Sequence, residues 1–425
     1  MVSVALPNRP WISDDPCDEI RGLAETAGTE IVGELTQKRH DIEAGTYIGK
    51  GKLQELTELV QARDADVVVF DNDLSPGQIR HLEKATEVKV IDRSELILDI
   101  FATRARSPEA KLQVELAQLE YALPRLKQMW SHLSRFEGGI GTRGPGETQL
   151  EEDRRLVAIK IRDLKHRLEE VKGRKEREVR SRNEEHTVSL VGYTNAGKSR
   201  LMNALTHAGV YVEDRLFSTL ETRTRQWHLK DWGKVLLSDT VGFIRDLPHH
   251  LVASFKATLE EVRQARLLLH VVDASNPYAE EHIKAVNTVL HELECDKKPS
   301  ILVLNKIDKL QDRLNLHLLK AHHPKAVAIS SLTGEGLDDL REAVMEALTA
   351  DFIDAEVRMD ASHGKVLAYL SAHAEIYHQE FRENRVSIRC RIPRQLLHHI
   401  AVDGVEVKEM SHMVENAEFG ILNSE

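Results

Sequence analysis

One short segment of the sequence has the residue types that hold phosphate groups. Gly192–Ser199 reads Gly-Tyr-Thr-Asn-Ala-Gly-Lys-Ser, after the apolar run Thr187–Val191 and before a helical pattern that begins at Arg200. A strand, a glycine-rich loop and a helix in this order direct backbone N–H groups at phosphate oxygens. Lys198 supplies a positive charge, and the Ser199 hydroxyl can bind Mg²⁺. We expect nucleotide contacts from Gly192, Tyr193, Thr194, Asn195, Ala196, Gly197, Lys198 and Ser199.

The run Ile301–Leu304 reads as a buried strand, and the four residues after it suit recognition of a base. The Asp308 carboxylate can accept hydrogen bonds from the ring N–H and the exocyclic amine of guanine. Adenine lacks this donor pair and would leave the carboxylate buried and unpaired. The Lys306 stem can cover the base, and Asn305 can connect this loop to the phosphate loop. Guanine is therefore favoured over adenine, which disfavours ATP, with contacts from Asn305, Lys306, Ile307 and Asp308.

A third base contact is predicted from the polar segment Ile329–Gly334, which follows another short apolar run. Doubly wound sheets bind ligands at the carboxyl ends of their strands, so this segment should lie beside the other two. The backbone N–H of Ser331 could donate to the guanine carbonyl. The residues expected to contribute are Ser330, Ser331 and Leu332.

The strand-like run that ends in Asp239-Thr240-Val241-Gly242 should sense the outer phosphate. Asp239 can hold Mg²⁺ through a water molecule, and the Gly242 N–H can reach a γ-phosphate. The preceding segment 224–237 reads as two strands joined by a turn at residues 231–233, which predicts one antiparallel pair in an otherwise parallel sheet. The expected contacts are Asp239, Thr240, Val241 and Gly242.

A threonine-rich segment before this hairpin should provide the second protein ligand of the metal ion. We favour Thr219 over Thr222, and a polar loop without a metal role is the remaining interpretation. The predicted metal ligands are thus Ser199 and Thr219, for one Mg²⁺ bound together with GTP. Lys198, Thr219 and Gly242 are the residues expected to act in catalysis. Phe217, Ser218, Thr219, Leu220 and Glu221 are expected to line the nucleotide.

The ordered set of motifs over residues 187–350 resembles a translation-factor-class P-loop GTPase. Two further runs, Gly138–Gln149 and Thr46–Leu56, are similar to the HflX family of ribosome-associated GTPases. This resemblance implies GTP and GDP as ligands, binding to the large ribosomal subunit and its RNA, and splitting of idle or stalled ribosomes. We also expect a low intrinsic GTPase activity that ribosomes stimulate. The alternative is a regulatory GTPase that switches a protein partner and has no ribosome role.

The residue after Gly242 is Phe243, where many GTPases with a fast intrinsic reaction have a glutamine that orients the attacking water. Phenylalanine can neither donate nor accept a hydrogen bond, so we expect slow hydrolysis by the chain alone. Phe243 and Ile244 could equally serve to pack the switch helix. Packing would not restore the missing polar group.

Two leucine-rich seams with alternating spacings of three and four predict a long antiparallel helical hairpin over residues 105–186. The loop between the helices, 138–146, holds five glycines, and its expected RNA contacts are Gly139, Gly141, Arg143 and Gly144; a flexible connector is the alternative. Residues 101–183 carry 19 basic and 13 acidic side chains, although the net charge of the chain is −11. This local excess suits attraction to phosphate.

The expected architecture is α/β with four parts. A small N-terminal α/β domain occupies 1–104, the helical hairpin with its glycine-rich tip 105–186, a P-loop GTPase domain with a mixed, mostly parallel sheet 187–350, and a small C-terminal α+β module 351–425. Within the first part we expect a strand at Thr29–Leu35, and within the last a helix at Val366–Phe381 followed by a strand at Arg385–Ile392.

Composition excludes several other classes for this 425-residue chain. No apolar run approaches the ~18–20 residues that span a membrane. The three cysteines, Cys17, Cys295 and Cys390, are scattered without metal-binding spacing and are expected to be buried or incidental thiols of a reducing compartment. We expect a monomer in the cytoplasm and leave a peripheral membrane association open.

Overall fold

A computed structural model describes the chain except residues 12, 130–144, 181–185, 207–215, 218, 220–221, 230–232, 246–259, 311, 351, 383, 403 and 411–425. The described residues form two compact units, Met1–Arg341 and Glu342–Glu425. All three cysteines are buried free thiols, as their sequence context predicts.

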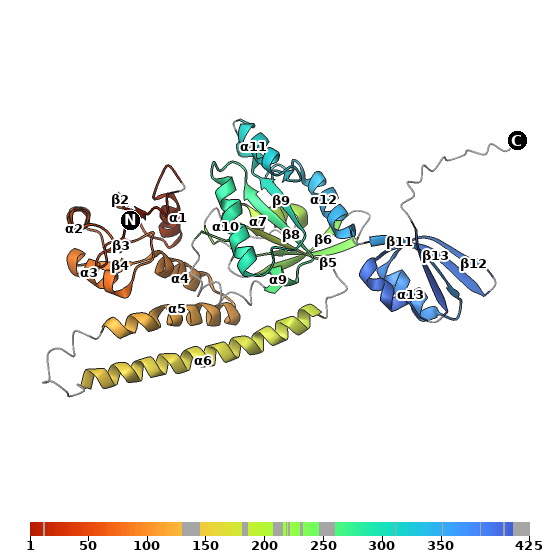
Figure 1. Ribbon diagram of the computed structural model, residues 1–425, viewed down its shortest axis with the longest axis horizontal. Coiled ribbons are helices and arrows are strands. Elements are labelled where there is room, and N and C mark those ends of the chain that lie inside the picture. The colour runs from red at the N-terminus through yellow and green to blue at the C-terminus, as the bar shows by residue number, and fades with distance from the viewer. Residues whose placement is uncertain are drawn as a thin grey trace. The chain divides into compact units, whose positions relative to one another are not determined.

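The first part of the chain is a small parallel α/β arrangement (Figure 1). A bridge between Val2 and Phe70 connects two pairs of parallel strands. The Ser75 side chain and Gln78 form a reciprocal capping box at the start of α3, as the Ser-Pro sequence suggests. The elements are β1 (Val2–Ala5), α1 (Asp18–Thr26), β2 (Leu35–Lys38), α2 (Lys50–Arg63), β3 (Val67–Val69), α3 (Pro76–Thr86), β4 (Lys89–Ile91) and α4 (Arg93–Arg104).

The strand predicted at Thr29–Leu35 is wrong, because the observed strand β2 begins only at Leu35. Its partner β1 begins at Val2, which pairs with Leu35, so no residue of β1 is available for the positions before Leu35. Alternation of polar and apolar residues indicates a half-buried strand but does not say where its partner starts.

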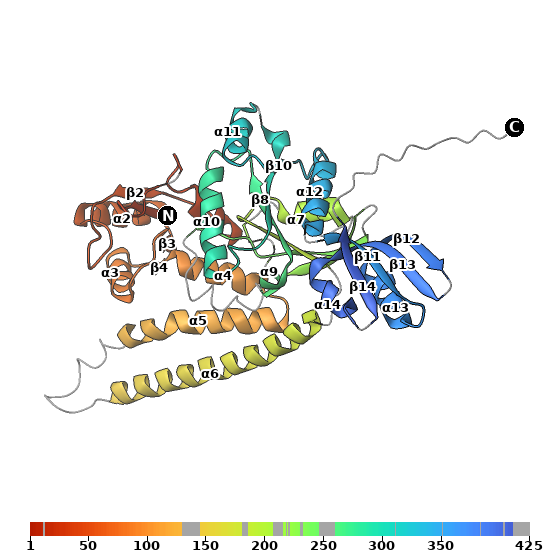
Figure 2. The ribbon, with the colours of Figure 1, turned by 45° about the vertical axis from the view of Figure 1, so that its right-hand side comes forward.

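Two long helices confirm the predicted hairpin: α5 (Pro108–Met129) and α6 (Pro145–Arg180) run side by side in Figures 1 and 2. Their shared apolar seam contains Leu116, Ile161 and Leu164 with five partly buried neighbours. Lys165 Nζ lies 2.8 Å from Glu120 Oε1 across the seam. The glycine-rich tip, with Gly139, Gly141, Arg143 and Gly144, lies outside the described residues.

A six-stranded sheet forms the next part, with the order β10-β9-β8-β5-β7-β6. All neighbouring strands are parallel except β6 and β7, which confirms the predicted mixed sheet with one antiparallel pair. The strands are β5 (His186–Gly192), β6 (Arg223–Leu229), β7 (Gly233–Asp239), β8 (Leu267–Asp273), β9 (Ser300–Asn305) and β10 (Val327–Ala328). The helices are α7 (Lys198–Thr206), α9 (Glu260–Gln264), α10 (Ala279–Glu292), η1 (Ile307–Lys309), α11 (Leu314–His322) and α12 (Leu337–Thr349).

The C-terminal unit is an antiparallel sheet in the order β12-β13-β11-β14 with two helices. The predicted strand at Arg385–Ile392 is confirmed as β13, whereas the predicted helix at Val366–Phe381 is only half right. The helix α13 ends at His373. The residues from Glu375 onward form the strand β12, because they pair with β13, with one register shift between Ile376 and His378. The elements are β11 (Phe352–Asp360), α13 (Gly364–His373), β12 (Glu375–Arg382), β13 (Arg385–Pro393), η2 (Arg394–Leu396), α14 (Leu397–Ile400) and β14 (Val405–Met410).

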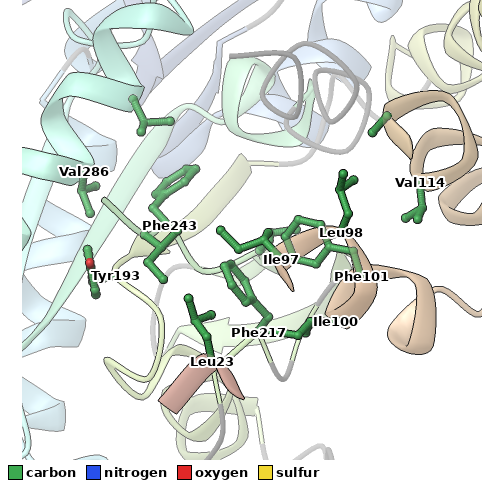
Figure 3. Close-up of a cluster of buried hydrophobic side chains, with 14 of the residues drawn as sticks. Leu23, Ile97, Leu98, Ile100, Phe101, Val114, Tyr193, Phe217, Phe243 and Val286 are labelled. Atoms are coloured by element: carbon green, nitrogen blue, oxygen red, sulfur yellow. The ribbon is translucent and has the colours of Figure 1, made fainter. Parts of the chain in front are cut away.

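One apolar core joins the N-terminal α/β part, the start of α5 and the six-stranded part. Figure 3 shows its centre, where Phe101 of α4 meets Phe217 edge to face with ring centroids 4.7 Å apart. Leu23 of α1 and Phe243 contribute to the same cluster. Phe217 and Phe243, which follow α7 and β7 in the chain, are therefore packed against the N-terminal part.

The hairpin seam supports a direct stability test. Leu164→Ala should destabilise the α5–α6 pair by about 2–3 kcal/mol, because the buried side chain leaves a cavity between the helices. Leu156→Ala on the same helix is the matched control, since Leu156 is 64% exposed. Hydrogen exchange of the α5 and α6 amides measures the effect, and equal exchange in the two variants would contradict the packing described.

Candidate nucleotide-binding site

A cleft at the carboxyl ends of β5, β7 and β9 brings the predicted motifs together, as expected for a doubly wound sheet. Five segments of the sequence contribute to it: the phosphate loop, the threonine-rich segment, the end of β7, the loop after β9 and the loop after β10. The lining residues are Thr194, Asn195, Gly197, Lys198, Ser199, Arg200, Phe217, Thr219, Thr240, Gly242, Lys306, Asp308, Lys309, Ser331 and Leu332.

The phosphate loop needs its two glycines. Gly197 has a φ of +94°, and a Cβ there would lie 2.4 Å from the Asn305 side chain. A Cβ at Gly192 would lie 2.2 Å from the carbonyl oxygen of Val271 on the neighbouring strand. A larger residue at position 192 would have to displace the β8 backbone, and one at position 197 would have a strained φ and would displace the Asn305 side chain.

Lys198 is buried beneath this loop. Its Nζ donates to the carbonyl oxygens of Gly192 at 3.0 Å and Tyr193 at 2.9 Å, so one of its three N–H donors remains for a phosphate oxygen. Burial lowers the pKa of Lys198 to about 8. A phosphate in the cleft would favour the charged form and reverse this effect.

Three oxygen-bearing side chains meet where Mg²⁺ would bind. The Ser199 and Thr219 hydroxyls are 2.8 Å apart, and Asp239 Oδ2 lies 2.6 Å from the first and 3.2 Å from the second. Neighbouring ligands of an octahedral Mg²⁺ are about 3 Å apart, since each lies about 2.1 Å from the ion. Among the described residues, no partner lies within hydrogen-bond distance of the buried Asp239 Oδ1. These residues fit a hydrated Mg²⁺ held by two hydroxyls, with Asp239 behind them.

Thr222, the alternative metal ligand, is engaged elsewhere. Its hydroxyl donates to Glu261 Oε1 of α9 at 3.1 Å. Thr219 is buried beside Ser199, so the geometry favours Thr219 for this role.

The base-recognition loops are connected as the sequence suggests. Asn305 Nδ2 donates to the carbonyl oxygen of Ala196 at 2.9 Å, which connects the β9 loop to the phosphate loop. The Ser330 hydroxyl donates to Asp308 Oδ1 and so orients this carboxylate. The Ser331 N–H, however, donates to Asn305 Oδ1 at 3.0 Å, so a guanine carbonyl would have to share this donor.

The segment after β7 continues alongside the phosphate loop. Thr194 N donates to the carbonyl oxygen of Phe243 at 2.7 Å, and Phe243 N donates to the carbonyl oxygen of Gly192 at 3.1 Å. We call these two hydrogen bonds the Phe243 bridge. A Cβ at Gly242 would lie 2.8 Å from Thr194 Cα, so the glycine allows this close approach. Phe243 and Ile244 are also almost fully buried in the shared apolar core, which contains residues of the N-terminal part.

Charged residues of the N-terminal part hold the same segment from its other side. Arg245 makes ion pairs with Glu19 of α1 and, at 3.3 Å, with Asp71. Glu19 also accepts a hydrogen bond from the hydroxyl of Tyr193 in the phosphate loop. The buried Arg93 pairs with Asp71 at 2.6 Å and donates to the Arg245 carbonyl oxygen at 3.2 Å. Although burial opposes ionisation of Glu19, the neighbouring Arg93 and Arg245 lower its pKa overall.

Several predicted residues make contacts within the protein, and of these only Thr240 also lines the cleft. The Thr240 hydroxyl donates to the Leu190 carbonyl oxygen at 2.6 Å, and Val241 is buried in the apolar core. Tyr193 faces Glu19, while Ile307 begins the 3₁₀ turn η1 and packs under the sheet. Ser218, Leu220 and Glu221 lie outside the described residues.

Sequence patterns missed Arg200 and Lys309 in the cleft, and nothing in the motifs signals the Arg245 contacts with Glu19 and Asp71.

Comparisons with known proteins agree with this geometry. Family models described as "GTP-binding GTPase N-terminal", "GTP-binding GTPase Middle Region" and "50S ribosome-binding GTPase" match residues 14–102, 104–182 and 187–306. The chain is 46% identical to GTPase HflX of Alkalihalophilus pseudofirmus, over 86% of each chain. It is also 46% identical to GTPase HflX of Escherichia coli, over 88% of this chain and 89% of that one.

The chain belongs to the HflX family of GTPases. It therefore binds and hydrolyses GTP. The cleft described above brings together residues of the segments predicted to bind the nucleotide. A crystal structure of a GTP-binding protein from Sulfolobus solfataricus with GDP is similar over 82% of this chain and 99% of that one, with 25% identity and a TM-score of 0.44. Among the described residues of this HflX-family chain, no helix has the length and apolar character that crossing a membrane requires.

Base selection can be reversed at one atom. Asp308→Asn should weaken GTP binding and improve xanthosine triphosphate binding, because the amide offers a donor where the carboxylate accepts. Equilibrium titration with fluorescent analogues of both nucleotides measures the change. Unaltered GTP affinity in this variant would show that the β9 loop does not read guanine.

The metal ligands can be distinguished by a matched pair of threonine variants. Thr219→Ala should weaken Mg²⁺-dependent binding of a GTP analogue by about tenfold or more and leave GDP binding less affected, because the ion that Thr219 would hold also bridges the β- and γ-phosphates, and GDP has no γ-phosphate. Thr222→Ala removes the same atoms from a hydroxyl bonded to Glu261 and should have little effect. The reverse order of effects would assign the metal to Thr222.

Proposed function

We propose that this GTPase binds the large ribosomal subunit in its GTP form, splits idle or stalled ribosomes and is released after hydrolysis. The observation that carries this proposal is the position of residues 243–245 between the phosphate loop and the N-terminal part. A γ-phosphate that recruits the Gly242 N–H would pull on the Phe243 bridge, and with it on the contacts of Arg245 to Glu19 and Asp71. The state of the nucleotide is thereby coupled to the N-terminal domain.

The helical hairpin supports a ribosomal partner over a small protein switch. Its second helix, α6, has 36 residues and at ~1.5 Å per residue reaches ~54 Å. The basic run Lys172–Arg182 at its end suits contact with RNA phosphates, for which long-range attraction speeds association. The description of the matching family model also names 50S ribosome binding. A partner switch would need no such extended basic arm.

Phe243 fits a GTPase that an external surface completes. With the glutamine position filled by a buried aromatic ring, no polar side chain at that position can orient the attacking water. We propose slow intrinsic turnover with one Mg²⁺, which the Ser199 and Thr219 hydroxyls would hold. We propose strong stimulation of this turnover by the large subunit. We further propose a monomeric, cytoplasmic protein with residues 1–104, 105–186, 187–350 and 351–425 as its four parts.

Ribosome splitting can be tested with the wild-type protein and with Asp308→Asn, each in the presence of GTP or of xanthosine triphosphate. Light scattering should show that the wild-type protein splits isolated ribosomes with GTP. The Asp308→Asn variant should do so only with xanthosine triphosphate. Co-sedimentation should place the protein on the large subunit with a GTP analogue and release it with GDP. Splitting that needs no nucleotide, or binding that is equal in both states, would instead favour the regulatory GTPase with a protein partner.

Two further variants locate the RNA contacts. Replacement of residues 138–146 by a serine linker should keep nucleotide binding and reduce splitting, since the segment lies outside every guanine motif. Neutral replacement of Lys172, Arg174, Lys175 and Arg177 should reduce the dependence of subunit binding on salt concentration, as loss of phosphate contacts does. Normal splitting by the loop variant would mean that the tip is a connector only.

A further inference from the structure

Asp273, at the end of β8, contacts the guanine-recognition loop although it belongs to none of the guanine motifs. Its Oδ2 lies 2.8 Å from Lys306 Nζ, in an ion pair whose side chains are 19% and 13% exposed. Its other oxygen, Oδ1, accepts hydrogen bonds from the Ser275 backbone and hydroxyl. One oxygen is thus fixed by the local turn, and the other is directed at Lys306.

The backbone around this pair is also fixed. Asp273 and Asn305 are register partners at the ends of β8 and β9, and Ala274 N donates to the Asn305 carbonyl oxygen at 2.8 Å. Lys306 has a φ of +63°, in the left-handed region that a lysine rarely adopts. The lysine stem therefore leaves the cleft floor in a direction set by its strained backbone, and Asp273 sets the position of its charged end.

Lys306 lines the nucleotide cleft, and Asp273 lines an adjoining cavity between α1 and α10 whose lining also includes Thr194 and Asn195 of the cleft. The ion pair therefore holds the ammonium of Lys306, a cleft residue, at a carboxylate that does not itself line the cleft. A free lysine stem has many rotamers, and ordering it upon binding costs affinity. The ion pair orders the stem before a nucleotide arrives.

We propose that Asp273 is a positioning residue for guanine binding, which holds Lys306 so that its aliphatic stem covers the base. The inference rests on the assignment of the β9 loop to guanine. Because Asp273 acts on the base and not on the phosphates, it should affect GTP and GDP equally. It should leave the rate of hydrolysis at saturating GTP unchanged.

A double-mutant cycle in the full-length protein tests this assignment. Asp273→Asn should weaken GTP and GDP binding by the same factor, about tenfold, and raise KM with kcat unchanged. Lys306→Met keeps the aliphatic stem and removes the charge, so Asp273→Asn should have no further effect in that background. Asp338→Asn, which breaks the exposed pair with Arg341 on α12, is the control and should change neither quantity.

Three results of the double-mutant cycle would overturn the proposed role of Asp273. An equal loss from Asp273→Asn in the wild-type and Lys306→Met backgrounds would mean that Asp273 acts independently of Lys306 and would overturn the proposal. Unchanged or tighter GDP binding in Asp273→Asn would overturn it too, as would a lower kcat at saturating GTP.

Thermal unfolding of each variant in the absence of nucleotide verifies the fold. If Asp273→Asn does not fold, Lys306→Met alone must show the equal loss for GTP and GDP, and a loss for GTP only would contradict the proposal. Tighter xanthosine triphosphate binding by Asp308→Asn tests the underlying loop assignment separately.

Discussion

Residues 243–245, which follow β7, make hydrogen bonds to the phosphate loop and ion pairs to the N-terminal part. The coupling between the nucleotide site and the N-terminal part depends on these contacts. On one side, the Phe243 bridge fastens this segment to Gly192 and Thr194 of the phosphate loop. On the other, Arg245 is paired with Glu19 and Asp71 of the N-terminal part, while Phe243 is buried among apolar residues of both parts. A segment with so many partners cannot adapt to a γ-phosphate by itself, because its movement must break contacts at the phosphate loop, at the N-terminal part, or at both.

Burial of Phe243 connects the coupling between the two parts with the slow intrinsic hydrolysis that we propose. A glutamine at position 243 would need water and polar partners, which this apolar core does not offer, whereas phenylalanine stabilises the contact between the two parts by its burial. The packing that couples the N-terminal part to the nucleotide site thus excludes the side chain that would orient water. In this account, slow intrinsic hydrolysis is a consequence of the coupling, and a large partner must supply what the core excludes.

The sequence predicts the parts of the site that depend on local spacing. The phosphate loop, the Asn305–Asp308 turn and the Ser199–Asp239 pair are short-range or strand-end features, and these residues come together as expected. The helical hairpin follows from its seam of leucines for the same reason. Long-range pairings were not predictable: the start of β2 depends on β1, and residues 375–382 become a strand because β13 is beside them. Likewise, Glu19 and Asp273 look like ordinary acidic residues until Arg245 and Lys306 are placed beside them.

We expect the γ-phosphate to break the Phe243 bridge and to loosen the contact with the N-terminal part in one step. Hydrogen exchange resolved to the Thr194 and Phe243 amides and to α1 measures both events in a single experiment, with the protein bound to GDP or to a non-hydrolysable GTP analogue. This coupling predicts faster exchange at both bridge amides and in α1 with the GTP analogue than with GDP. Equal protection in the two states, or faster exchange at the bridge without any change in α1, would contradict it.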